Sequence, residues 1–333
     1  MVRIIGTGLY APGEAIDNAE LAALVDIEVD VERLEGKLGI HRRHIAHLRG
    51  LNETTADFAE RAARAAIADA RVDPEEIGLF VVATDTPEFI SPATSMLLQG
   101  RIQGGQRFTG AYDLGASCSS FVAALDTVAR YVATDPATRY ACVVGVYNMP
   151  AYVRPGDAFG YSIFADGAGA VVLERTAANG SRYLGGQLLS DGTQWDSVCV
   201  YAGGTRRPVT GERLASGQYG LELLQRLPGD RNVKLWPVVV ERLLQKIGRS
   251  ADSIDHFLFT QINRSVIAEV MDILDQPMSK TTTVMDRYGY TGSACIPMAF
   301  HTAVTERRIS RGDAVVMVAS GAGLAVASAA FVM

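Results

Sequence analysis

Gly115-Ala116-Ser117-Cys118-Ser119-Ser120-Phe121 places one thiol among small side chains. An extended-looking run, Phe108–Leu114, precedes it, and a helical pattern follows it to Val132. A cysteine at such a junction can sit at the first turn of a helix, where unpaired N–H groups and the helix dipole favour a thiolate. Two interpretations of Cys118 follow: a nucleophile that a bulky substrate can reach, or a buried structural cysteine.

Composition and charge exclude several classes of protein. The chain has 333 residues, 48% hydrophobic and 20% charged, which suffices for two core-bearing halves. Its net charge is −6 without a basic stripe, so we expect no nucleic-acid binding. The four cysteines are widely spaced and form no CxxC pair, so we expect no disulfide framework and no metal site. They also predict a reducing, cytoplasmic location. These cysteines are Cys118, Cys142, Cys199 and Cys295.

The C-terminal run Ala314–Met333 is nearly uncharged and has the length of a membrane span. However, Ser320-Gly321-Ala322-Gly323 interrupts it, and Val315–Val318 has the character of a buried strand. We therefore expect two buried strands joined by a glycine turn and no association with a membrane. The N-terminus shows no secretory signal pattern.

The first half of the chain alternates strands and helices. Apolar runs at Ile4–Tyr10, Leu79–Ala83 and Ala141–Val146 predict buried strands. An Ala-rich, capped stretch at Thr54–Ala70 predicts a helix. The motif Asp166-Gly167-Ala168-Gly169-Ala170 leads into a strand and not a helix, so we interpret it as a packing turn and not as a phosphate loop.

The second half repeats this order. A helix from about Trp236 to Ile247 precedes a strand at Phe257–Thr260, a helix at Arg264–Leu274 and a strand at Thr281–Met285. A second small-residue junction, Gly289–Ala294, then takes the place that the Cys118 stretch has in the first half. The pattern predicts a fold duplicated within one chain and a layered α/β architecture. We divide the chain into residues 1–177 and 178–333, with the linker near Arg175–Arg182.

The motifs resemble those of the β-ketoacyl-acyl-carrier-protein synthase III family of the thiolase superfamily. Gly39-Ile40-His41-Arg42-Arg43 is similar to its Gly-Ile-x-x-Arg segment, and Asp113–Phe121 to its nucleophile elbow. Phe164–Ala170 is similar to Phe-Gly-Asp-Gly-Ala-Gly-Ala, Val81–Thr84 matches the strand before the pocket, and Gly321-Ala322-Gly323 matches a terminal glycine triplet. The resemblance covers nearly the whole chain.

This resemblance implies a five-layer αβαβα fold and a homodimer. It further implies an acyl-enzyme on Cys118, loaded from a coenzyme A or carrier-protein thioester, with no other cofactor. The backbone N–H groups of Cys118 and Ala322 would form the oxyanion hole that stabilises the tetrahedral intermediate.

The sequence departs from the family at two positions. Thr260 stands where the family has the histidine of His-Gln-Ala-Asn, and Tyr290 where it has the asparagine of Gly-Asn-Thr-Ser. Both family side chains donate hydrogen bonds to the enolate formed when a malonyl thioester loses CO₂. Loss of one such donor costs about 10²–10³ in rate, so we expect no ordinary malonyl condensation. Tyr290 is our first candidate for orienting an acceptor, with a pocket-filling ring as the alternative; Thr260 is the second.

No histidine takes the family's catalytic place. We expect His41, His44 and His47 at the surface, His256 packed at a strand start and His301 too far along its helix to contact the sulfur. The residues that match the family's substrate and carrier sites are Arg33, Lys37, Asn263 and Arg264. The alternative for each of the three basic residues is a solvated surface charge. Ser91 stands where relatives place a bulky residue against the other subunit's pocket, which would suit a larger acyl chain.

Three functions remain open. The first is transfer of an acyl group from Cys118 to a small-molecule acceptor through oxygen, nitrogen or an activated carbon, as in natural-product biosynthesis. The second is carbon–carbon bond formation of the polyketide or fatty-acid type. The third is a non-catalytic homologue that binds acyl groups or pairs with an active synthase.

Overall fold

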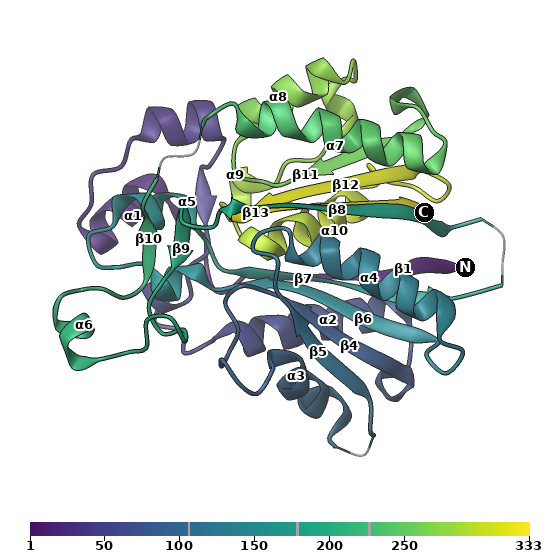
Figure 1. Ribbon diagram of the computed structural model, residues 1–333, viewed down its shortest axis with the longest axis horizontal. Helices are drawn as coiled ribbons and strands as arrows, with labels where there is room; N and C mark the ends of the chain where they lie inside the picture. Colours follow the sequence, from purple (N-terminus) through teal and green to yellow (C-terminus); the bar gives the residue numbers. More distant parts are fainter. Residues whose placement is uncertain (106, 178–179, 226–227) are drawn as a thin grey trace.

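The computed structural model describes residues 1–105, 107–177, 180–225 and 228–333. Its helices and strands form alternating layers around two sheets, one above the other in Figure 1. This arrangement confirms the α/β fold expected from the sequence. The predicted linker Arg175–Arg182 includes residues 178–179, which lie outside the described residues.

The first sheet takes all its strands from the first half of the chain. Its strand order is β1 (Val2–Tyr10), β7 (Gly167–Arg175), β6 (Tyr140–Tyr147), β4 (Ile77–Ala83) and β5 (Gly110–Leu114). β4 runs parallel to β5 and β6, whereas β7 runs antiparallel to β1 and β6. β6 is buried along its whole length, as its continuous apolar run predicts for a strand covered on both faces.

The second sheet repeats this order within residues 182–332. Its strands are β8 (Arg182–Gln194), β13 (Gly323–Val332), β12 (Ala314–Gly321) and β11 (His256–Phe259), with β11 and β12 parallel and the other pairs antiparallel. β12 and β13 confirm the two buried strands expected at the C-terminus. Among the described residues, no helix is long and apolar enough to span a membrane.

Helices cover and separate the two sheets. α2 (Thr55–Ala70) and α3 (Thr94–Gln103) pack on the outer face of the first sheet, and α7 (Arg231–Ile247) packs on the second beside α8 (Arg264–Ile273). α4 (Ser120–Thr134) and α10 (Cys295–Thr305) lie between the sheets. α7 begins before the predicted Trp236, because Val233 also faces the core and extends the buried stripe toward the N-terminus.

The prediction of a strand at Thr281–Met285 is wrong. Only the first residue of this segment pairs as a strand would, in an isolated β-bridge with Phe257. Gln261 explains the difference. Its side-chain amide donates to the Thr282 carbonyl at 3.2 Å and accepts from the Val284 N–H at 2.8 Å. A side chain therefore makes the hydrogen bonds that a backbone ladder would otherwise provide, and the segment turns instead into the short helix α9 (Met285–Tyr288).

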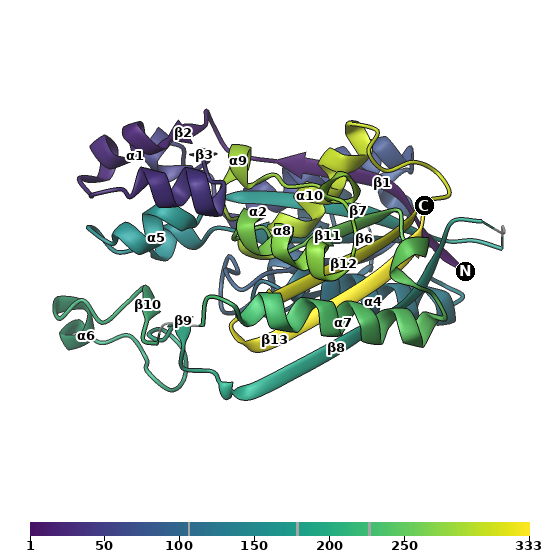
Figure 2. The ribbon, with the colours of Figure 1, turned by 90° about the horizontal axis from the view of Figure 1, so that it is seen from above.

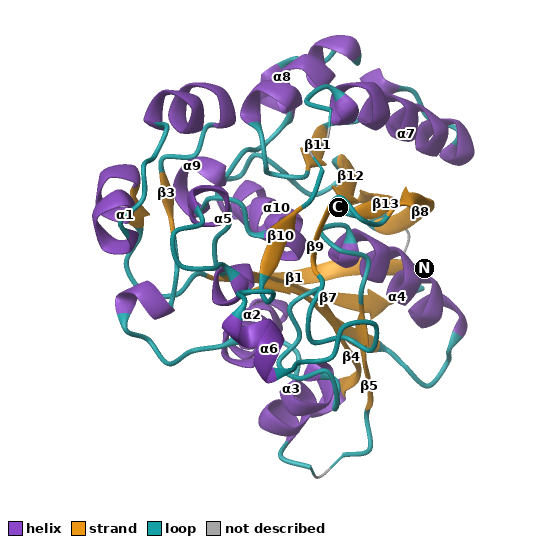
Figure 3. Ribbon diagram, turned by 60° about the vertical axis from the view of Figure 1, so that its left-hand side comes forward, coloured by secondary structure: helices purple, strands orange, loops and turns teal. Residues whose placement is uncertain are grey.

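Shorter elements gather at the end of the molecule away from the chain termini, as Figure 2 shows. Turning this end forward, in Figure 3, reveals how they lie over the ends of the sheets. These elements are α1 (Asn18–Val25), α5 (Ala158–Ile163), α6 (Gly211–Ala215), the pair β2 (Ile16–Asp17) and β3 (Arg42–Arg43), and the pair β9 (Val198–Val200) and β10 (Leu221–Leu223). Of these elements, α5, β9 and β10 contribute side chains to the site described next.

Candidate active site around Cys118

The turn that carries Cys118 lies between β5 and α4 and is held by its own serines. Ser117 adopts a left-handed conformation with φ of 52°. The Ser119 hydroxyl donates to the Ala116 carbonyl at 2.6 Å, and the Ser120 hydroxyl donates to the Ser117 carbonyl at 2.5 Å. The small polar residues noted in the sequence therefore fix the turn and leave space in front of the sulfur.

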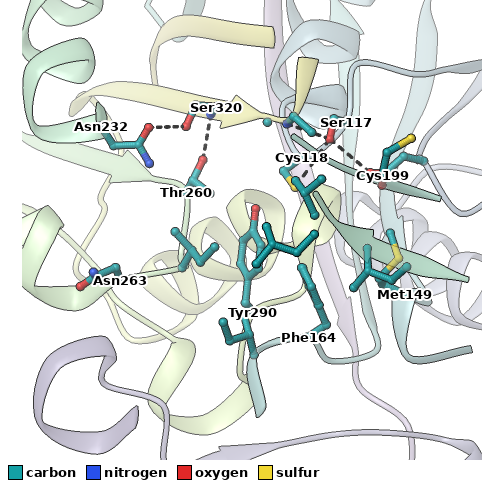
Figure 4. Close-up of a pocket in the computed structure, with 18 of the residues that line it drawn as sticks. Ser117, Cys118, Met149, Phe164, Cys199, Asn232, Thr260, Asn263, Tyr290 and Ser320 are labelled. Carbon is teal, nitrogen blue, oxygen red and sulfur yellow. Dashed lines mark hydrogen bonds between the residues drawn. The ribbon is translucent and has the colours of Figure 1, made fainter. Parts of the chain in front are cut away.

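Cys118 lines a cavity of about 1020 Å³, to which α5, β9 and β10 also contribute side chains. Figure 4 shows the thiol of Cys118 and the ring of Tyr290 directed into this space. Cys118 therefore has access to a cavity that could hold a substrate, as the nucleophile interpretation requires, and its role as the nucleophile stays a prediction. Apolar side chains form much of the wall, including Met149, Phe159, Ile163, Phe164, Val198, Leu221, Ile262 and Val266.

The electrostatic environment does not favour a resting thiolate at Cys118. Burial raises the pKa of the thiol to about 12, and the nearby Asp85 carboxylate adds to the increase. Hydrogen bonds from Tyr290 and Ser117 oppose this effect but are smaller. The thiolate expected from the start of a helix is thus not the resting form, because desolvation and a neighbouring negative charge outweigh the N–H groups.

Tyr290 is both part of the cavity wall and a hydrogen-bond donor. Its ring is 2% exposed and packs against Phe164 and Tyr147, at centroid separations of 5.8 and 6.4 Å. Burial raises the pKa of its phenol well above 10, so the hydroxyl keeps its proton. That hydroxyl lies close enough to Cys118 to lower the pKa of the thiol. The ring of Tyr290 therefore fills part of the pocket, and the role of its hydroxyl in orienting an acceptor stays a prediction.

Thr260 lines the cavity next to the C-terminal strand pair. Its Oγ1 accepts a hydrogen bond from the Ser320 N–H at 2.9 Å. Ser320 is in turn held by its own hydroxyl, which accepts from Trp236 Nε1 at 3.1 Å and donates to Asn232 Oδ1 at 3.1 Å. The Thr260 hydroxyl can donate one hydrogen bond into the cavity but offers no base.

The two N–H groups expected to form the oxyanion hole come from segments that meet. A Cβ atom on Gly321 would lie 2.6 Å from the backbone nitrogen of Cys118, so the terminal glycine turn packs directly on the elbow. The Ala322 N–H donates to Ser117 Oγ at 3.1 Å. A substrate oxygen would compete with this hydroxyl for Ala322, and the oxyanion hole stays a prediction.

The histidines lie outside the described lining of this cavity. His256 Nε2 lies 2.8 Å from Thr282 Oγ1, and His301 Nδ1 lies 2.9 Å from Thr7 Oγ1. The remaining ones lie near the surface, with His41 and His47 exposed and His44 half-buried. The described residues also contain no cluster of His, Cys, Asp or Glu suited to a metal ion.

The mouth residues predicted from the sequence separate into two groups. Arg33 and Lys37, from the helical segment Glu32–Leu38, line the cavity together with Asn263. Arg264 is not among the described lining residues. Its side chain packs instead against Gly39, where a Cβ atom would lie 2.9 Å from Arg264 Cβ.

Ser91 is exposed and also lies outside the described lining. The proposed contact of Ser91 with another subunit's pocket is a property of an assembly and stays a prediction.

Sequence reasoning missed several polar residues of the cavity, above all Asp85 and Arg231. Arg231 is half-buried at the start of α7, and burial lowers the pKa of its guanidinium. Asp85 follows the buried strand β4 after one intervening residue, and a carboxylate near the carboxyl end of such a strand was a usable signal. No local pattern marked Arg231.

Comparisons with known proteins agree with the geometry. A family model described as 3-oxoacyl-[acyl-carrier-protein] synthase III matches residues 112–192, and its C-terminal counterpart matches residues 244–333. The β-ketoacyl-[acyl-carrier-protein] synthase III of Sinorhizobium medicae is 34% identical over 329 residues, which cover 97% of each chain.

Solved structures give the same result. The 3-oxoacyl-[acyl-carrier-protein] synthase III of Aquifex aeolicus superposes with a TM-score of 0.86 at 27% identity, covering 100% of both chains. A priming β-ketosynthase from a polyketide biosynthetic pathway superposes with a TM-score of 0.85 at 25% identity, covering 100% of this chain and 96% of the other. The chain therefore belongs to the 3-oxoacyl-[acyl-carrier-protein] synthase III family, with a thiolase-like fold.

Proposed function

We propose that the protein is an acyltransferase that loads an acyl group from a coenzyme A or carrier-protein thioester onto Cys118. It then passes the group to an oxygen, nitrogen or activated carbon of a small-molecule acceptor, and not to a malonyl enolate. The observation that carries this proposal is the set of groups around the sulfur. A phenol and a threonine hydroxyl line the cavity there, and the described lining contains no imidazole.

The contacts of these two groups argue against malonyl condensation. The Tyr290 hydroxyl lies near the sulfur of Cys118, and the Thr260 hydroxyl already accepts from a backbone N–H. An enolate oxygen would find at most one weak donor from each, whereas each well-placed donor contributes about 10²–10³ in rate. Acyl loading forms no enolate, so it is less affected.

The cavity supports a reaction with two organic substrates. Its volume of about 1020 Å³ lies at the upper end of the range common for small-molecule sites, about 300–1,000 Å³. Apolar walls suit an acyl chain. Arg33 and Lys37 at the mouth suit the phosphates of coenzyme A or of a phosphopantetheine arm.

We further propose that the chain forms a homodimer, probed by light scattering over a range of concentrations. Apolar side chains cluster on the surface near Ser91 in sequence, and Ile90 is 86% exposed. Contiguous exposed apolar surface marks sites of protein–protein contact, so we assign these side chains to the dimer interface. A monomeric mass at every concentration would contradict this proposal.

A carbon–carbon bond-forming synthase is the second candidate, because the relatives named above are β-ketoacyl synthases. A pre-acidified carbon, such as that of a β-dicarbonyl compound, would need less help to form an enolate than a malonyl thioester. Product analysis separates the candidates by the bond formed. The third hypothesis, a non-catalytic acyl-binding homologue, predicts that Cys118 is unreactive toward thioesters.

Intact-protein mass spectrometry tests the proposal with acetyl-, hexanoyl- and benzoyl-coenzyme A. We expect an adduct in the wild-type protein and none in Cys118→Ala. Labelled malonyl-coenzyme A, supplied to the acylated protein, should release little CO₂.

A matched variant gives this test its control. The double substitution Thr260→His with Tyr290→Asn restores the side chains that typical family members carry, and it should raise CO₂ release by about 10²-fold or more. Rapid CO₂ release by the wild-type protein would contradict our argument. If no thioester labels the protein, the enzyme hypothesis itself fails.

A further inference from the structure

Asp85 brings an unexplained carboxylate to the elbow. It lies just beyond β4 and lines the cavity. Its Oδ2 accepts a hydrogen bond from Ser117 Oγ at 3.3 Å. Its Oδ1 is buried and has no hydrogen-bond partner among the described residues. A buried carboxylate oxygen without a partner is costly in a structural role, so its presence beside a nucleophile calls for a chemical explanation.

Ser117 connects this carboxylate to the sulfur. Its Oγ lies 3.3 Å from Asp85 Oδ2, 3.9 Å from Cys118 Sγ and 3.1 Å from the Ala322 nitrogen. Figure 4 shows the Ser117 hydroxyl next to Cys118, with its hydrogen bonds drawn as dashed lines. The hydroxyl has one proton and can accept others. With Ala322 N–H as donor and the carboxylate as acceptor, it can also accept the thiol proton. Such contacts are long at rest and shorten when substrate is bound.

The charges show which way the proton must move. Burial raises the pKa of the Asp85 carboxyl to about 6, while burial and the Asp85 charge raise the pKa of the Cys118 thiol to about 12. Near neutral pH the carboxylate is therefore charged and the thiol is protonated. Two adjacent negative charges are disfavoured in this buried place, so sulfur can attack only as its proton leaves.

We propose that Asp85 is the proton acceptor for Cys118 and that it acts through the Ser117 hydroxyl. It supplies the base that Thr260 does not offer. This inference rests on the proposed acyl-transfer function. Ser117 relays the proton, Asp85 accepts it, and Cys118 is the group that bonds to the acyl carbon.

Loading proceeds with balanced bonds and protons. The Cys118 S–H bond breaks and its proton passes to Ser117 Oγ, while the Ser117 proton passes to Asp85 Oδ2. Sulfur forms a bond to the thioester carbonyl carbon, and the donor's C–S bond then breaks. The departing thiolate takes the proton back from Asp85. Nothing is oxidised or reduced.

Transfer to an O–H or N–H acceptor uses the same base. The acceptor's proton goes to the carboxylate of Asp85 as its oxygen or nitrogen attacks the acyl carbon. The bond between that carbon and Cys118 sulfur breaks, and the thiolate takes the proton through Ser117.

Two readouts with opposite expected directions test the relay. Asp85→Asn keeps the shape of the side chain but removes its charge. Without that charge, the Cys118 pKa falls and alkylation by iodoacetamide becomes faster. Without the base, acyl loading from hexanoyl-coenzyme A becomes slower, by about 10²-fold or more. Ser117→Ala should slow loading without accelerating alkylation, because it breaks the relay and leaves the carboxylate in place.

The pH profile of loading assigns the base. In the wild type, loading should decline as pH falls below about 6, and Asp85→Asn should lack this limb. The titratable groups whose pKa values Asp85 raises all keep their protons in that range: Cys118, Cys199, Tyr147 and Tyr152. Cys199→Ser serves as the control that assigns alkylation to Cys118, since both thiols line the cavity.

The outcomes separate this inference from the function on which it rests. Faster alkylation with slower loading in folded Asp85→Asn supports the relay. Loading at the wild-type rate in Asp85→Asn, or a parallel fall of both rates, overturns it, while a Cys118-dependent adduct leaves the acyl-transfer proposal intact. If no thioester loads the wild-type protein, both proposals fail.

Discussion

Gly321→Ala gives a test of how closely the C-terminal turn positions the nucleophile. A Cβ atom at this position would lie 2.6 Å from the Cys118 nitrogen and 2.8 Å from Ser117 Cβ. Ordinary contacts begin at 3.4 Å, and neither neighbour is the free end of a flexible side chain. Gly321 does not have a positive φ, so the expected effect is steric and not a matter of backbone conformation.

The size of the effect follows from that overlap. The elbow and the turn must separate by about 1 Å, and a displacement of that size at a reacting group can cost about 10²-fold in rate. The same overpacking should lower the free energy of unfolding by about 1–3 kcal/mol. We therefore expect a folded variant with a severe loss of acyl loading.

Loading is measured as the rate at which hexanoyl-coenzyme A adds the acyl mass to the intact protein, alongside the free energy of unfolding in urea. Gly100→Ala is the matched control, because a Cβ atom there would contact nothing within 4 Å and the residue lies in α3. It should load normally and gain about 0.5–1 kcal/mol in stability. Loading at the wild-type rate in folded Gly321→Ala would refute the reasoning.

Three further predictions concern stability and substrate binding. Burial raises the pKa of the Asp166 carboxyl above its value in the unfolded chain, to about 7. The free energy of unfolding should therefore fall as pH rises toward about 7. In Asp166→Asn, the free energy of unfolding measured in urea should depend less on pH over this range. Trp236→Phe should destabilise the protein by about 2 kcal/mol, because it leaves the Ser320 hydroxyl without its indole donor and opens a small void; a change below half of that would argue against this estimate. Arg33→Ala combined with Lys37→Ala should raise KM for coenzyme A thioesters with little change in kcat, and more at low salt than at high salt; a KM independent of salt would show that these cations do not bind phosphates.

The sequence predicted the parts of this protein that local pattern controls. Small residues around Cys118, a preceding extended run and a following apolar stripe predicted the elbow between β5 and α4. The glycine-interrupted C-terminal run predicted β12 and β13 correctly. These features could be predicted from the sequence because turns, caps and side-chain periodicity depend on residues that are close together along the chain. The strand expected at Thr281–Met285 failed because Gln261, which is distant along the chain, supplied its hydrogen bonds.

Tertiary structure alone decided the chemistry of the cavity. Asp85 and Ser117 are 32 residues apart in sequence, and Ala322 reaches Ser117 across 205 residues. The helix start by itself favoured a thiolate at Cys118, but the folded chain buries the sulfur next to a carboxylate and reverses that preference. Desolvation and charge proximity are properties of the space around a residue, and this space is created only when the two halves pack together.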